Sequence, residues 1–214
     1  MKRFLFLFFL SLLFLSGCNS IADPLGFTES SDAVLDTVTK EEVQANIKNE
    51  NYTSIEDMLD GNFTLVDVIS EGTNQTTNIF ATRQFTLNEL SSLIQKGTNP
   101  DEVSEVQDNK QILIYNDEIL TLQVDEKDPD LVLAEVATKE FVREHYSPNY
   151  FNGFFALWVL DEVLDVDDWG KKRANACKQG NCYGGYFNTK KYRSGDVGSL
   201  RSSSSRGGGL FSGK

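Results

Sequence analysis

The sequence predicts a small α+β domain, in which a mainly antiparallel sheet of about five strands is packed by helices. The strand signals are short stretches rich in Val, Ile, Leu and Phe. Phe63–Ser70 and Asn78–Phe85 predict a hairpin around a polar loop. Gln111–Tyr115, Glu118–Val124 and Leu131–Val136 are joined by short polar turns and predict a three-stranded antiparallel meander. Strands grouped apart from helices are typical of the α+β class.

The clearest helix signal is Leu87–Lys96, where Leu and Ile recur at intervals of three and four residues. Thr86 is expected as its N-cap, and Glu89 follows Thr86 at the spacing of a capping box. Gly97 is expected to end this helix, because glycine is favoured just after a helix C-terminus. A second packing helix is expected from Asn149–Val166. Shorter helices are expected after Thr39, at Tyr52–Leu59 with Thr53 or Ser54 as cap, and at Glu140–Tyr146 with Thr138 as cap.

Asn149–Val166 is the most apolar stretch outside the N-terminal segment. A helix that is apolar all round is either buried or faces something apolar. Burial in the core is one interpretation, and a partner-binding surface is the other. The side chains that would form that surface are Phe151, Phe154, Phe155 and Trp158. Acidic residues at the end of the stretch oppose the helix dipole and anionic lipids, which disfavours a membrane-inserted version.

The N-terminus predicts a signal peptide over residues 1–17. Lys2 and Arg3 precede an apolar run that is too short to span a bilayer, since a spanning helix needs about 20 residues. The run has no polar face, which disfavours a buried first helix. The sequence Leu15, Ser16, Gly17, Cys18 resembles the lipobox of bacterial lipoproteins. That resemblance implies lipid transfer to the Cys18 thiol, cleavage before Cys18, and a chain held at the extracytoplasmic face of the membrane.

Composition divides the rest of the chain into a tether over residues 18–45, a globular domain over 46–169 and a Gly/Ser-rich tail over 170–214 that is expected to be disordered. Cys18 to Gly170 contains 8 Lys or Arg and 31 Asp or Glu, a net charge of −23. Lys171 to Lys214 contains 10 Lys or Arg against Asp196 alone, a net charge of +9. The acidic body argues against nucleic acid as a partner, because phosphates would be repelled.

The tail offers two features. Cys177 and Cys182 are expected to form a disulfide outside the cytoplasm, with a redox or metal role as the alternative. The basic residues are interleaved with aromatic ones and could bind anionic lipid, anionic wall polymer or the acidic body of the chain itself. A solvated linker is the simpler interpretation of such a tail.

We find no catalytic motif, no cofactor-binding loop and no metal-ligand spacing in the sequence. His145 lacks a nucleophile in a recognisable context and is expected to be a helix-end residue. Asp125, Glu126, Asp128 and Asp130 are spaced somewhat as in a calcium loop, but the glycine and the final glutamate of that loop are missing. A solvated turn is the better interpretation.

The middle of the chain resembles an uncharacterised family of bacterial lipoproteins, known only as a domain of unknown function. The matching stretches are Phe63–Ile69, Leu113–Gln123, and Glu140–Tyr146 with Pro148 and the apolar residues that follow. The resemblance implies a membrane lipoprotein of Gram-positive bacteria with no assigned activity.

The sequence therefore favours a lipid-anchored, non-enzymatic interaction or accessory protein of the cell envelope. Two alternatives stay open. One is a cell-wall-active enzyme that uses carboxylates. The other is a regulatory subunit of a membrane complex that docks through residues 149–166.

Overall fold

The computed structural model describes residues 35–70, 75–178 and 182–188. Within these residues, six α-helices accompany one six-stranded antiparallel sheet, so the predicted α+β class is confirmed. The sheet has one strand more than expected. The extra strand is β3 (Glu102–Val103), whose two residues are too few to give a pattern in the sequence. Residues 1–34 and 189–214 lie outside the described residues, and with them the predicted signal peptide, Cys18 and most of the predicted tail.

The other elements follow in chain order. They are α2 (Lys40–Asn49), α3 (Ile55–Asn62), β1 (Thr64–Ser70), β2 (Thr76–Thr82), α4 (Leu87–Thr98), β4 (Lys110–Ile114), β5 (Glu118–Val124), β6 (Val132–Thr138), α5 (Lys139–His145), the 3₁₀ helix η3 (Pro148–Phe151), α6 (Leu157–Val163), α7 (Trp169–Cys177) and the 3₁₀ helix η4 (Tyr186–Asn188).

The strand order is β1-β2-β6-β5-β4-β3, and every neighbouring pair is antiparallel. The predicted hairpin is β1–β2 and the predicted meander is β4–β5–β6. Strand β6 pairs with β2 on its other side, which joins the hairpin and the meander into one sheet.

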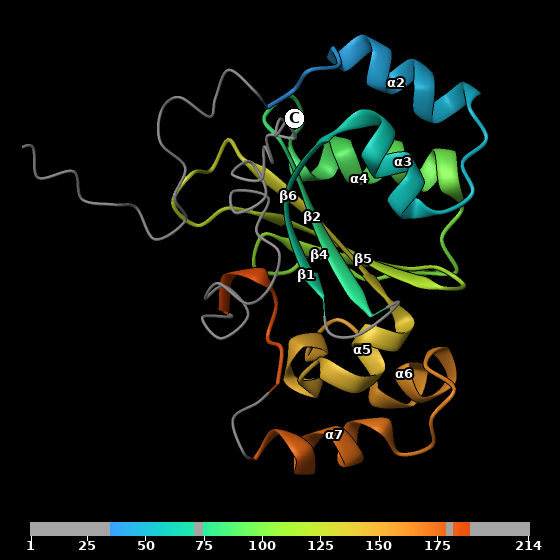
Figure 1. Cartoon of the computed structure of the whole chain (residues 1–214), viewed down its shortest axis with the longest axis vertical. Coiled ribbons are helices and arrows are strands. Elements are labelled where there is room, and N and C mark those ends of the chain that lie inside the picture. Colours follow the sequence, from blue (N-terminus) through green and yellow to red (C-terminus); the bar gives the residue numbers. More distant parts are fainter. Residues whose placement is uncertain (1–34, 71–74, 179–181, 189–214) are drawn as a thin grey trace, which may run out of the picture. The chain divides into compact units, whose positions relative to one another are not determined.

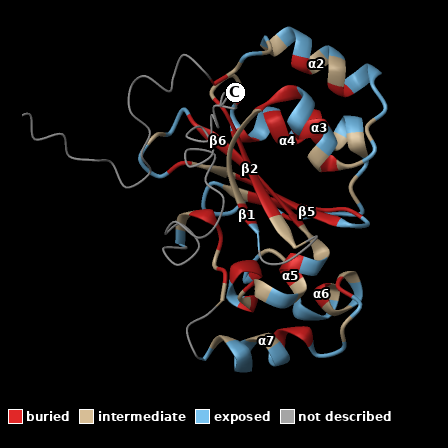
Figure 2. Ribbon diagram, viewed as in Figure 1, coloured by how far each residue is buried: buried red, intermediate tan, exposed pale blue. Residues whose placement is uncertain are grey.

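The two faces of the sheet carry different layers, because side chains alternate along each strand. Val132, Ala134 and Val136 of β6 join the apolar core formed with α2, α3 and α4. Glu135 lies between them and faces the opposite layer, which contains α5, α6, α7 and the two 3₁₀ helices. Figure 1 shows the two groups of helices on either side of the sheet, and Figure 2 shows that the strands between them are largely buried.

The folded domain extends beyond both predicted boundaries. The expectation of disorder from Gly170 onward is wrong for residues 170–178 and 182–188. Tyr183 and Tyr186 in that stretch are buried, and the backbone of Tyr183 pairs with that of His145 and Ser147 at 2.8 Å. The tyrosines supply the apolar area that the glycines and lysines around them lack. At the other end, Leu35 and Val43 are already buried, so the domain begins before residue 46.

Asn149–Val166 does not form one helix. After η3 the chain turns at Gly153, whose φ of 85° is a left-handed conformation that favours glycine. It becomes helical again only at α6, which ends at Val163 with Leu164 as its C-cap, and Asp165 follows in a left-handed conformation with a φ of 55°.

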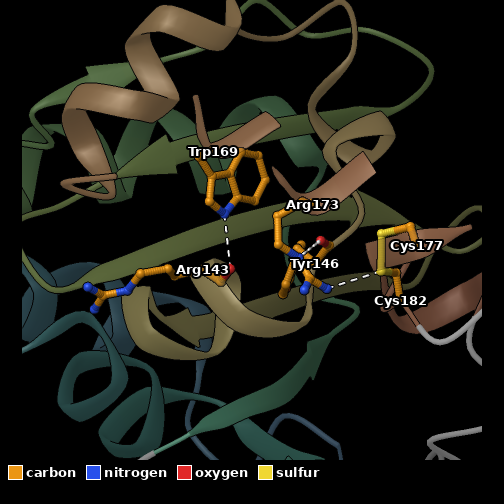
Figure 3. The surroundings of a disulfide bond; sticks show 6 residues. All are labelled: Arg143, Tyr146, Trp169, Arg173, Cys177 and Cys182. Carbon is orange, nitrogen blue, oxygen red and sulfur yellow. Dashed lines mark hydrogen bonds between the residues drawn. A yellow bond between two sulfur atoms is a disulfide. The ribbon is translucent and has the colours of Figure 1, made fainter. Parts of the chain in front are cut away.

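Helix α7 is attached to α5 by side-chain contacts with backbone carbonyls (Figure 3). Trp169 donates from Nε1 to the carbonyl oxygen of Arg143 at 3.0 Å. Arg173 donates from Nε to the carbonyl oxygen of Tyr146 at 3.1 Å. The structure pairs Cys177 with Cys182 in a disulfide, which holds the end of α7 beside the returning chain.

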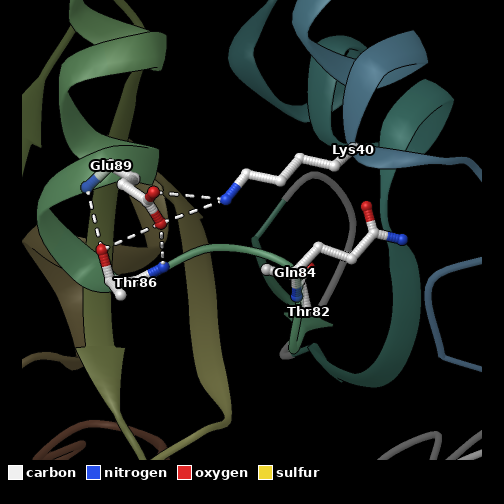
Figure 4. A network of polar contacts seen from close by, with 5 residues as sticks. All are labelled: Lys40, Thr82, Gln84, Thr86 and Glu89. Carbon is white, nitrogen blue, oxygen red and sulfur yellow. Dashed lines mark hydrogen bonds and ion pairs between the residues drawn. The ribbon is translucent and has the colours of Figure 1, made fainter.

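Helix α4 begins with the expected capping box (Figure 4). The Glu89 backbone donates to Thr86 Oγ1 at 3.3 Å, and the Thr86 backbone donates to Glu89 Oε2 at 2.9 Å. The same Glu89 carboxylate pairs with Lys40 Nζ at 3.2 Å, which links the starts of α2 and α4. Both residues are partly exposed, so the ion pair contributes little to stability by itself.

The prediction that Gly97 ends α4 is wrong. Helix α4 continues to Thr98 and is capped by Asn99 in a left-handed conformation, with a φ of 49°. Gly97 instead allows α2 to approach α4. A Cβ atom at position 97 would lie 2.5 Å from Ile47 Cγ2 and 2.6 Å from the Ile47 carbonyl oxygen.

Gly97→Ala should therefore destabilise the domain by about 1–3 kcal/mol, because the added methyl group overpacks the α2–α4 contact. The matched control is Gly61→Ala in α3, where the nearest atom to an added Cβ is 3.9 Å away. This control should stabilise the protein by about 0.5–1 kcal/mol, since alanine is the better helix former. Urea unfolding measures both effects. Equal effects of the two substitutions would show that Gly97 has no packing role.

Candidate functional site

A row of residues crosses the sheet face that is covered by α5, α6, α7 and the two 3₁₀ helices, which we call the C-terminal layer. Asp67 of β1 pairs with Ile79 of β2, and Ile79 pairs with Glu135 of β6. Glu135 in turn pairs with Thr121 of β5. Three polar side chains thus share one line across four neighbouring strands.

Each of these polar side chains accepts a hydrogen bond from a tyrosine hydroxyl of the C-terminal layer. Tyr186 donates to Asp67 Oδ2 at 3.2 Å, Tyr146 to Glu135 Oε1 at 2.6 Å, and Tyr150 to Thr121 Oγ1 at 3.0 Å. The second oxygen of Glu135 accepts from the Tyr186 backbone at 3.1 Å. The three hydroxyls fix the C-terminal layer in register with the sheet.

Glu135 is the most buried acidic group in this network, with 4% of its surface exposed. Burial raises the pKa of its carboxyl, while hydrogen bonds from Tyr146 and the Tyr186 backbone act in the opposite direction. Burial also raises the pKa values of Tyr146, Tyr150 and Tyr183 well above the ordinary value, and the neighbouring Glu135 adds to each shift. These phenols therefore act as hydrogen-bond donors over the whole physiological pH range.

Lys110 of β4 lies at the edge of the network. Its Nζ is 4.1 Å from the centroid of the Tyr150 ring and 4.4 Å from that of Phe154, and it donates to the Tyr150 carbonyl oxygen at 3.2 Å. Burial lowers the pKa of this lysine, and the charge of Glu135 opposes the change. A cavity of about 400 Å³ adjoins Lys110, Tyr150 and Phe154. The cation–π contacts explain how the partly buried ammonium group of Lys110 is stabilised, and they make Phe154 a packing residue.

The four aromatic side chains that the sequence offers for partner binding have different environments. Phe151 is fully buried and packs against Tyr146 and Trp169, so it belongs to the core of the C-terminal layer. Phe154 and Phe155 are half-buried. Trp158 is 69% exposed, the largest exposed fraction among the large hydrophobic side chains that the structure describes as exposed.

Leu157, which precedes Trp158 in the chain, is 46% exposed and is not among the residues predicted for partner binding. Its side chain rests on Gly170 of α7, where an added Cβ would lie 3.0 Å from both Leu157 Cδ atoms. We call Leu157 and Trp158, with the half-buried Phe155 and Val159, the α6 apolar surface. It is followed in the chain by four exposed carboxylates, at Glu162, Asp165, Asp167 and Asp168.

The remaining candidate residues have structural roles. His145 lies at the end of α5, with Nε2 2.9 Å from Gln75 Oε1. Asp125 accepts backbone hydrogen bonds from Lys127 at 2.7 Å and Asp128 at 3.1 Å, which forms a turn between β5 and β6. In the described part of the chain, no group of three or more His, Cys, Asp or Glu residues is arranged to hold a metal ion.

Comparison with known proteins gives no match: no family model, no curated protein sequence and no solved structure is similar to this chain. The resemblance to a bacterial lipoprotein family therefore stays a prediction. Within residues 35–70, 75–178 and 182–188, no helix has the length and apolar character needed to cross a membrane.

Glu135→Gln should remove a pH-dependent part of the stability. Because the pKa of Glu135 is raised above its ordinary value of 4.5, the folded protein binds this proton more tightly than the unfolded chain does. The stability that it contributes therefore falls as the pH rises from 4.5 through the folded pKa. Relative to Glu135→Gln, the wild type should lose free energy of unfolding as the pH rises above about 4.5, and this loss should end once the pH exceeds the folded pKa.

Urea unfolding across this pH range measures the difference. The control is Glu140→Gln on the exposed side of α5, which should give a curve parallel to that of the wild type. Parallel curves for wild type and Glu135→Gln would show that Glu135 has no raised pKa.

Proposed function

We propose that this protein is a lipid-anchored, non-enzymatic interaction protein at the extracytoplasmic face of a cell membrane. In this proposal it binds another membrane or envelope protein through the α6 apolar surface. The observation that carries the proposal is that two consecutive residues of one short helix, Leu157 and Trp158, both expose large apolar side chains.

Exposed tryptophan supports binding for an energetic reason. Tryptophan is among the residues most often found at the centres of protein interfaces, where truncation to alanine commonly weakens binding by about 2 kcal/mol or more. Leaving the exposed part of each side chain in water forgoes about 25 cal/mol for every Å² of apolar surface that a partner could cover. A partner that covers them recovers that free energy.

The surrounding charge favours a protein over a lipid surface. Four exposed carboxylates lie between the α6 apolar surface and the first basic residues of α7, Lys171 and Lys172. Anionic headgroups would repel these carboxylates. A protein pocket that is apolar at its centre and carries Lys or Arg at its rim matches both features.

Trp158→Ala should weaken partner binding by about 2 kcal/mol or more, because it removes the centre of the interface. The partner is identified first. For this, a photo-crosslinking amino acid is placed at position 158 in cells that produce the anchored protein. The matched control carries it at Val106, which is 45% exposed and lies outside the α6 apolar surface. We expect a discrete adduct with one membrane protein from position 158 and none with that protein from position 106.

Once that protein is purified, its binding to Trp158→Ala and Val106→Ala is compared directly. Shortened chains in this comparison must keep residues up to Asn188, because Tyr183 and Tyr186 belong to the folded domain. The same adducts from positions 158 and 106, or unchanged affinity in Trp158→Ala, would refute the docking role.

The anchoring part of the proposal rests on the lipobox-like sequence that ends at Cys18. Two acyl chains suffice for stable membrane attachment, at about 0.8 kcal/mol per buried methylene. In cells fed an alkyne-labelled fatty acid, the wild-type protein should acquire the label and sediment with membranes, and Cys18→Ser should do neither. Cys177→Ser is the control and should keep the label. Labelling of the Cys18→Ser protein would exclude Cys18 as the lipid attachment site.

A further inference from the structure

A cavity of about 560 Å³ lies at one end of the sheet, and its lining includes Gly97 and Asn99 at the end of α4. Its walls come from the α2–α3 connection, the end of α4, the β4–β5 turn and the end of β6. Its volume falls in the range of about 300–1,000 Å³ that is usual for small-molecule sites.

The charged residues that line this cavity are all acidic. Its lining includes the carboxyl groups of Glu50, Asp101, Asp117 and Glu118. None of its described lining residues is Lys, Arg or His. A ligand with negative charge would be repelled here, and a ligand with positive charge would be attracted.

Helix ends strengthen the same preference. Glu50 caps the C-terminus of α2 and Asn99 caps that of α4, so the negative ends of two helix dipoles lie at the cavity. The positive N-terminus of α3 is also present, but Glu118 covers it. Its Oε2 accepts from the Ile55 backbone at 2.7 Å.

Two aromatic rings, Tyr52 and Tyr115, complete the lining. Tyr115 shares a hydrogen bond of 2.9 Å with Thr98 Oγ1, which fixes its ring at the cavity wall. Burial raises the pKa of Tyr115 to about 12, with smaller contributions from Glu118 and Asp101. Aromatic faces attract ammonium groups when these are desolvated.

We infer that this cavity binds the primary ammonium group of an organic amine. A primary ammonium carries three hydrogen-bond donors and suits a wall made of carboxylates, hydroxyls and amide oxygens. A metal ion fits less well, because no metal-holding set of carboxylates occurs among the described residues. The ammonium can belong to a small free amine or to a lysine side chain. This inference is independent of the docking role proposed for α6.

The test is isothermal titration of the full-length protein in detergent micelles with 1,5-diaminopentane and with Nα-acetyl-lysine methylamide. The first probe represents a free amine and the second a lysine side chain. The matched neutral probe is 1,5-pentanediol, and tetramethylammonium supplies charge without hydrogen-bond donors. We expect binding of at least one primary ammonium probe, and weaker or no binding of the diol and of tetramethylammonium.

Variants assign the binding to the cavity. Asp101→Asn and Glu50→Gln should each weaken ammonium binding by about tenfold, which corresponds to about 1.4 kcal/mol. Glu140→Gln removes an exposed carboxylate outside the cavity and should leave binding unchanged. Far-ultraviolet circular dichroism establishes that each variant is folded.

Three results would overturn the inference. The first is no heat of binding with either ammonium probe at millimolar concentration. The second is equal binding of the diol and the diamine. The third is equal loss of binding in Glu140→Gln and in Asp101→Asn. Binding of the lysine probe alone would assign the site to a lysine-bearing peptide, and binding of the diamine alone would assign it to a free amine.

Discussion

The position of Glu135 constrains the whole C-terminal layer. An ionised carboxylate in a protein interior is strongly unfavourable unless hydrogen-bond donors surround it or it keeps its proton. Glu135 meets this requirement through the Tyr146 hydroxyl and the Tyr186 backbone, both of which come from chain that follows the sheet. Removing that layer would break both hydrogen bonds and expose the carboxyl and its two donors to water. Docking of the layer and satisfaction of Glu135 are therefore one event.

The two sheet faces illustrate two ways of holding a layer in place. Helices α2, α3 and α4 pack on an apolar face, where shape is the constraint and a single glycine, Gly97, sets how closely α2 approaches. The opposite layer also buries four tyrosines, Tyr146, Tyr150, Tyr183 and Tyr186, so it does not rely on aliphatic packing alone. Its tyrosine hydroxyls bond to polar residues at fixed positions on the strands, which specifies orientation as well as affinity.

The sequence predicts what depends on local pattern. The α+β class, the meander and the capping box of Thr86 and Glu89 follow from alternation and from residue spacing within a few positions. The network around Glu135 does not, because its two partners lie 11 and 51 residues away. A glutamate inside an apolar strand was the available signal. Composition was misleading after Gly170, since low apolar content overall concealed two tyrosines in buried positions.

The candidate binding features belong to different layers, and this separation has a functional consequence. The α6 apolar surface lies in the C-terminal layer, whereas the acidic cavity is formed mainly by α2, α3, α4 and the strand ends. Thr138 belongs to both regions, because it lines the cavity and its hydroxyl caps the first turn of α5. A ligand in the cavity and a partner on α6 would thus contact different side chains, and any coupling between them would have to pass through the sheet or through this cap. Coupling of that kind is reciprocal, so a ligand that strengthens partner binding must itself bind more tightly to the docked protein.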